Sequence, residues 1–260
     1  GATAHHPPSG PRRGGDGGDG VIIVRYQIGT ITATEKATGG TISYYGGKTI
    51  HTFTGNGTFA TTSSWDAGTN EVEYVCVGGG GGGGGTDPNC WGAGGGGAGQ
   101  MKTGTTTISH PSPFSIAIGA GGRGSTKHGD DAASNGSNTT VQFPAAGLTA
   151  HGGGYGSSNN PSTQTNGADG TNHPSVPSGS GSGGGASKSN SSTAGAGGPA
   201  ALGAYPGGSM PGGNHYCGAG GGGAGGAGGR GSDAPGNRTG PQIAGDGLGG
   251  IGLQVPTTFR

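Results

Sequence analysis

The sequence predicts an all-β protein with little or no helix, a glycine-rich sandwich that combines short antiparallel strands with packed polyglycine II helices. Two observations predict this fold. Residues 21–77 are rich in Val, Ile, Thr, Tyr and Phe, which favour strands. The rest is dominated by glycine: the chain has 73 glycines among 260 residues, and eight of them are consecutive at 78–85.

Gly-Gly and Gly-Asn-Gly turn signals divide the first region into short strands and hairpins. The strand candidates are 21–34, 40–45, 48–61 and 70–77, and two more, at 113–119 and 139–144, lie among the glycine-rich segments. Strand alternation places Val72, Tyr74 and Cys76 on one face of their strand. Cys76 is therefore interpreted as a small apolar strand residue.

The eight glycines at 78–85 suit neither a strand nor an α-helix, because they have no side chains to pack and lose much conformational entropy. Polyglycine II is an extended threefold helix whose outward N–H and C=O groups can bond to neighbouring copies. We expect 78–85, 92–99 and 218–225 to adopt it and to neighbour one another, with no room for a Cβ at a position such as Gly95. The alternative is a flexible linker, as Gly/Ser-rich segments such as 178–187 often are.

The segment GDGGDGVIIV at 15–24 resembles GDGLGGIGLQ at 245–254. This repeat predicts that residues 1–26 end a preceding glycine-rich unit. Residues 27–77 would then form a strand-rich segment for attachment or packing. Residues 78–260 would form a polyglycine II domain with variable loops, the longest at 125–150 and 157–178.

Charge and composition exclude several classes of function. Lys plus Arg and Asp plus Glu are 12 each, so a basic footprint for nucleic acid is missing. No apolar run approaches the ~20 residues of a membrane span, so we expect no membrane insertion. The sequence shows no nucleophile elbow, paired carboxylates in apolar context or cofactor signature, so we expect no enzyme and no cofactor.

Two features of the sequence are weak candidates for metal binding. GGDGGDGVI at 14–22 fits a calcium-binding nonapeptide, but those repeats work in tandem and one copy is present, so a turn before a strand is favoured. The eight His residues lack metal-ligand spacing, and His51 is interpreted as a surface or half-buried hydrogen-bonding residue. We therefore expect no metal site.

Cys90 and Cys217 each precede a GAGGGGAG segment, at 92–99 and 218–225. Their parallel placement is compatible with a disulfide between them. Two free thiols that cap glycine runs are the favoured alternative.

The junctions KTIHTFTGNGTFAT, EVEYVCVGGGGGGGG, FSIAIGAGGRG and GLTAHGGGYG resemble the glycine-rich domain of phage tail fibres and related virion proteins. The likeness extends, more distantly, to glycine-rich adhesins at the tips of phage long tail fibres. Those adhesins pack glycine-rich motifs as polyglycine II helices and touch the host through variable loops. The resemblance implies a non-enzymatic fibre or adhesin protein of a virion or other extracellular assembly.

The partners it implies are other copies of the chain or fibre subunits, and a glycan or outer-membrane protein of a host surface. Aromatic and imidazole side chains between the glycine runs are the candidate receptor-binding residues. They are Trp91, His128, Tyr155, His173, Tyr205, His215 and Tyr216. Each could instead pack over the ends of the glycine runs. The alternative function is a non-viral extracellular filament, sheath or coat protein.

Overall fold

The computed structural model describes residues 15–27, 35–65, 70–85, 92–125, 133–143, 147–158, 181–187, 198, 204–210, 218–231 and 247–259. These residues form ten strands and one short 3₁₀ turn, η1 (Thr257–Phe259), and no α-helix occurs among them. The predicted all-β class is confirmed.

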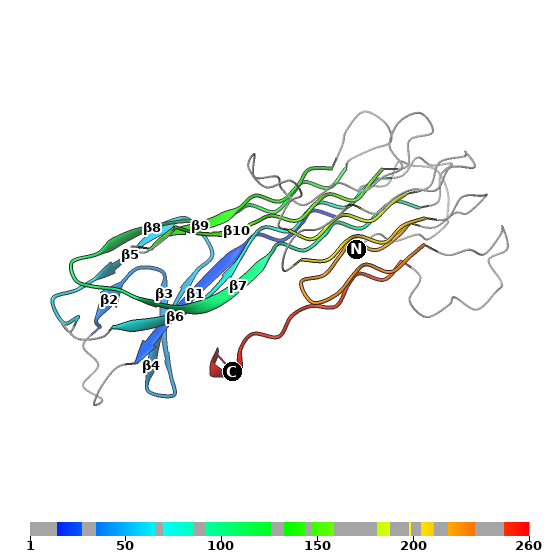
Figure 1. The fold of residues 1–260 in the computed structure, drawn as a ribbon. Helices are drawn as coiled ribbons and strands as arrows, with labels where there is room; N and C mark the ends of the chain where they lie inside the picture. The colour runs from blue at the N-terminus through cyan, green and yellow to red at the C-terminus, as the bar shows by residue number, and fades with distance from the viewer. Residues whose placement is uncertain are drawn as a thin grey trace.

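The strands form two five-stranded antiparallel sheets (Figure 1). The first sheet has the order β3-β4-β1-β6-β7, with β3 at Thr41–Tyr45, β4 at Lys48–Phe53, β1 at Val21–Gln27, β6 at Glu71–Val77 and β7 at Met101–Thr107. The second has the order β10-β9-β8-β5-β2, with β10 at Gly147–Ala150, β9 at Thr139–Gln142, β8 at Pro113–Ala117, β5 at Gly57–Thr61 and β2 at Ala37–Thr38.

One hydrophobic core joins the two sheets into a sandwich. Alternate residues of β1 supply Ile22, Val24 and Tyr26, and Phe59 and Phe114 face them from the second sheet. Val72 and Cys76 of β6 are buried in this core and Tyr74 packs against it, as the alternation of β6 predicts. Trp65, which follows β5, is also buried, and its indole N–H donates to the carbonyl of Ile108 at 3.0 Å.

The strands predicted at 113–119 and 139–144 are confirmed as β8 and β9. Sequence reasoning missed β7, whose sequence MKTGTTT holds one apolar residue, and β10, which lies inside the expected loop 125–150. β1 crosses the boundary expected at residue 26 and lies between β4 and β6. The sandwich therefore includes strands on both sides of residue 77.

Six strands are joined to extended runs, most of them rich in glycine, on one side of the sandwich (Figure 1). The runs 15–20, 92–100 and 133–138 enter β1, β7 and β9, whereas 78–85, 119–125 and 151–158 continue from β6, β8 and β10. Further runs at 181–187, 204–210, 218–231 and 247–251 pack beside them. We call this set of runs the glycine lattice.

The C-terminal segment leaves the glycine lattice and returns to the sandwich (Figure 1). The Arg25 guanidinium lies 4.6 Å from the centre of the Phe259 ring, so a cation–π contact joins the segment to β1. Arg25 also forms an ion pair with Glu73, and the hydrogen bond from Arg25 holds the pKa of the Glu73 carboxyl below its usual range. Among the described residues, no helix has the length and apolar character needed to cross a bilayer.

Candidate binding surface

Backbone hydrogen bonds hold the run 78–85 with a period of three residues. Gly81 and Gly84 donate to Gly97 and Gly94 of the run 92–100. Their neighbours Gly79 and Gly82 donate to Ser137 and Ser134, and Gly80 and Gly83 donate to Gly18 and Gly15. Successive N–H groups of one run therefore point to three different runs.

The carbonyls of this run follow the same period. Gly79 and Gly82 accept from Gly153 and Gly156, whereas Gly80 and Gly83 accept from Gly122 and Ser125. The run 78–85 thus bonds to five other runs, which a two-sided β-ladder cannot do. A period of three matches the three residues per turn of polyglycine II. The helical conformation of the individual runs stays a prediction.

The lattice excludes side chains at most of its glycines. A Cβ built on Gly81, Gly96 or Gly97 would lie under 3.0 Å from a neighbouring carbonyl oxygen, closer than real Cβ atoms come. At Gly95 the nearest atom, the nitrogen of Gly221, is 3.0 Å away, so this position is less restrictive than expected. At Gly80 the nearest atom is 3.5 Å away, which is ordinary contact.

The three expected neighbours are ordered side by side. The run 92–99 bonds to 78–85 on one side and, through the N–H groups of Gly95 and Ala98, to Ala219 and Gly222 on the other. Thus 92–99 lies between the other two runs. None of the three is an isolated surface loop.

Short polar side chains three residues apart satisfy N–H groups at the edge of the lattice. The carboxylates of Asp16 and Asp19 accept from the N–H groups of Gly124 and Gly121, both at 2.7 Å. In the same way, the side-chain oxygens of Asn135 and Asn138 accept from Tyr155 and Gly152. The two aspartates of the calcium-like motif therefore bind backbone amides, and no metal-binding cluster occurs among the described residues.

Several runs end together at the side of the lattice that faces away from the sandwich. Gly84 bonds to Gly94 near this outer end, and Ser134 bonds to Arg123. Gly247 likewise bonds to Arg230. The described residues that flank 86–91, 126–132, 211–217 and 232–246 therefore lie at the outer end of the lattice, and the four segments themselves lie outside the described residues.

The described residues include two of the seven candidate receptor-binding residues. Tyr155 is half-buried in the run 151–158, and Tyr205 is 39% exposed at the start of the run 204–210. Tyr205 lies away from the outer end, because its carbonyl accepts from the N–H of Gly183 near the inner end of that run. Outside the described residues lie Trp91, His128, His173, His215 and Tyr216, and with them Cys90 and Cys217.

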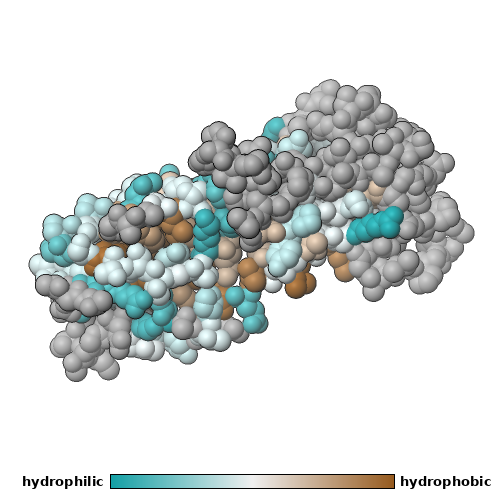
Figure 2. All heavy atoms as spheres, viewed as in Figure 1, coloured by the Kyte–Doolittle hydropathy of each residue, from teal (hydrophilic) through white to brown (hydrophobic). Residues whose placement is uncertain are grey.

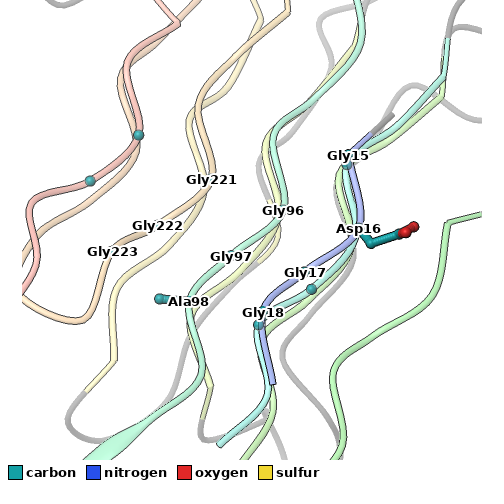
Figure 3. Close-up of a pocket in the computed structure, with 15 residues that line it drawn as sticks. Gly15, Asp16, Gly17, Gly18, Gly96, Gly97, Ala98, Gly221, Gly222 and Gly223 are labelled. Atoms are coloured by element: carbon teal, nitrogen blue, oxygen red, sulfur yellow. The ribbon is translucent and has the colours of Figure 1, made fainter. Parts of the chain in front are cut away.

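An open groove of about 300 Å³ crosses one face of the lattice (Figure 3). Its walls are the runs 15–18 and 249–250, and its floor consists of residues from 80–83, 96–98 and 221–223. Figure 3 shows the Asp16 side chain pointing away from Gly96 and Gly221, so backbone atoms form most of the lining. This arrangement suits recognition of another backbone.

Exposed apolar side chains continue from one wall of this groove along the C-terminal segment. Leu248, Ile251 and Leu253 are all at least half exposed. Figure 2 shows hydrophobic residues at the surface along the edge of the glycine-rich half.

His51 lies away from these surfaces, in the core of the sandwich. It is fully buried, so the expectation of a surface or half-buried residue is wrong, although its hydrogen-bonding role holds. Its Nδ1 lies 2.7 Å from the carbonyl of Gly39, so Nδ1–H is the donor, and Nε2 accepts from the Tyr26 hydroxyl at 3.2 Å. Burial lowers the pKa of this imidazole.

Comparison with known proteins identifies one family. The sequence profile of the family described as "Glycine-rich domain" matches residues 54–259. No curated protein and no solved structure matches the chain.

Proposed function

The chain belongs to the glycine-rich domain family, and from this premise we propose that it is a non-enzymatic fibre or adhesin protein of a phage. In this proposal, the sandwich attaches the chain to its assembly, and segments at the outer end of the glycine lattice touch a host surface. The chain would then act in the virion or another extracellular assembly.

The observation that carries the proposal is that several lattice runs end together at the outer end of the lattice. The sequences that connect these ends include Trp91, His128, His215 and Tyr216. Binding residues often lie on loops that a rigid scaffold positions. Aromatic side chains are frequent anchors for partners.

The way in which the lattice is held together supports the proposal. Its core consists mainly of backbone, so it depends little on the side chains of the connecting segments. The runs are held by backbone bonds of 2.7–3.1 Å, such as Gly81 N–H to Gly97 at 2.8 Å. A change of sequence at the outer end therefore leaves the bonds of the lattice in place. Such a scaffold suits a protein whose contact surface varies while its fold persists.

A cell-binding assay tests the proposal. The labelled chain is incubated with a panel of intact bacteria, beside a variant in which Trp91, His215 and Tyr216 are replaced by Ala. We expect the wild type to bind a subset of the panel and the variant to lose binding, with an unchanged circular dichroism spectrum and Tm. A matched control, Tyr44→Ala, changes an aromatic residue that is 49% exposed on the sandwich and should keep binding.

Binding to no surface, or equal binding by the triple variant, would contradict the adhesin assignment. The alternative is an extracellular filament, sheath or coat protein. In that case electron microscopy should show many copies stacked end to end through residues 1–77, with no tip that faces a cell.

A further inference from the structure

The groove of the glycine lattice contains backbone groups that form no hydrogen bond within the described part of the chain. The N–H and C=O of Gly96 form no hydrogen bond to any residue that the structure describes, and the same is true of the Gly81 carbonyl and the Gly221 N–H. All three residues line the groove. Elsewhere at the lattice edge, Asp or Asn side chains bind such N–H groups.

The period of the lattice explains why these groups are unpaired. In the run 92–100, the N–H groups of 94 and 97 bond to one neighbour and those of 95 and 98 to another. Gly96 belongs to the third set of positions in this run, and Gly96 faces the groove. Gly81 is in a similar position: in the run 78–85, the carbonyls of 78, 81 and 84 form the one set that accepts from no N–H group of a described residue. The groove therefore occupies the place of a missing neighbour.

Glycine is also present around the groove where the single chain does not need it. A Cβ on Gly15 or Gly18 would meet nothing within 4 Å, and one on Gly249 would meet its nearest atom at 4.0 Å. At Gly80 the nearest atoms belong to the runs on either side, at 3.5 Å and beyond. None of these glycines has a positive φ. Another chain in the groove would give these positions the close backbone contact that other lattice glycines have.

We propose that the groove binds an extended glycine-rich segment of a second copy of this chain, which donates to Gly81 and Gly96 and accepts from Gly96 and Gly221. The two walls, 15–18 and 249–250, are themselves extended, glycine-rich and mostly exposed. Next to its own groove, each copy therefore presents an extended glycine-rich backbone whose N–H and C=O groups could bond in the groove of its partner. Such self-complementary surfaces are typical of symmetric dimers.

The test is sedimentation equilibrium of the full chain over a range of concentrations. We compare the wild type with Gly80→Leu, which fills the groove, and with Gly55→Leu. Gly55 is a matched control because a Cβ there also meets nothing within 4 Å, but it lies in the turn between β4 and β5. We expect wild type and Gly55→Leu to self-associate and Gly80→Leu to remain a monomer.

Amide exchange of Gly96 provides a second readout, and it should slow as the wild type associates. A wild type that stays monomeric at every concentration, or a Gly80→Leu variant that associates equally well, overturns the proposal. If Gly80→Leu fails to fold, Gly249→Leu on the opposite wall replaces it in the same assay. A labelled GAGGGGAG peptide with terminal lysines identifies the source: peptide binding without self-association refutes the second copy and assigns the groove to a glycine-rich segment of another protein.

Discussion

Two adjacent glycines of the run 78–85 provide a sharp test of how the lattice is packed. A Cβ at Gly81 would be too close to the Gly154 oxygen, by more than 1 Å relative to the 3.4 Å lower limit of ordinary van der Waals contact. At Gly80 the nearest atom is already at 3.5 Å. Gly81→Ala and Gly80→Ala therefore make the same chemical change at neighbouring positions with opposite steric consequences.

The expected cost of Gly81→Ala follows from what Gly154 must give up. Gly154 accepts from Gly97 and donates to Ser182, each at 2.8 Å, and moving it would weaken both bonds. Each bond contributes about 1 kcal/mol net, and overpacking costs about 1–3 kcal/mol. We therefore expect a loss of about 3–5 kcal/mol in the free energy of unfolding, a large share of the ~5–15 kcal/mol of a typical domain.

Gly80→Ala should instead be neutral or should stabilise by about 0.4–1 kcal/mol, because Ala reduces the entropy of the unfolded chain. Urea unfolding measures both variants, with the fluorescence of buried Trp65 and far-UV circular dichroism as probes. The protein is kept dilute so that self-association does not contribute to stability. Equal stability of the two variants would refute the packing described here.

Three further predictions concern single side chains. Asp16→Ala should lower the free energy of unfolding by about 1–3 kcal/mol, because the Gly124 N–H loses its acceptor; Asp16→Asn keeps an oxygen and should lose less in the same urea assay. Burial lowers the pKa of His51 below the ordinary histidine value of 6.5, so the unfolded chain takes up a proton first, and stability should be greatest above pH 6.5 and decline as the pH falls below it. His51→Gln should decline less steeply, and equal slopes of stability against pH would contradict this. Burial raises the pKa of the Cys76 thiol to about 12, so peptide mapping after iodoacetamide treatment should find Cys76 unmodified until urea unfolds the chain, whereas rapid modification of the folded protein would show that it is accessible.

The sequence predicts the strands of the sandwich where side chains alternate. β6, β8 and β9 follow such patterns, with Val72 and Cys76 or Phe114 and Ile116 pointing into the core. β7 escaped prediction because its threonines and Gly104 show no apolar alternation, and its pairing with β6 holds it in place. That pairing is a long-range contact, which a local pattern cannot reveal.

The order of the runs in the lattice could not be predicted, because consecutive glycines give no side chain to distinguish one register from another. Six of the runs are positioned by the strand to which each is joined, as β6 positions 78–85. One signal in the sequence was informative and was missed. Asp16 with Asp19, and Asn135 with Asn138, repeat at the three-residue period of the lattice and mark its edge.

The groove also depends on long-range order, because it lies where one neighbour of 78–85 and 92–100 is missing. The family resemblance implied other copies of the chain or fibre subunits as partners, but the individual glycines concerned, Gly80, Gly81 and Gly96, are identical to those around them. Their roles differ through their place in the three-residue period alone.

Amide hydrogen exchange at 78–85, followed by NMR, tests the central claim most directly. Every N–H group of this run donates a hydrogen bond, from Gly78 to the carbonyl of Gln100 through to Gly85, which donates to the Ser158 hydroxyl oxygen. If the glycine lattice is a hydrogen-bonded core, all eight amides should be protected to an extent similar to that of β6. Exchange at the rates of an unstructured chain, with β6 still protected, would show that the run is a flexible linker and would contradict the account.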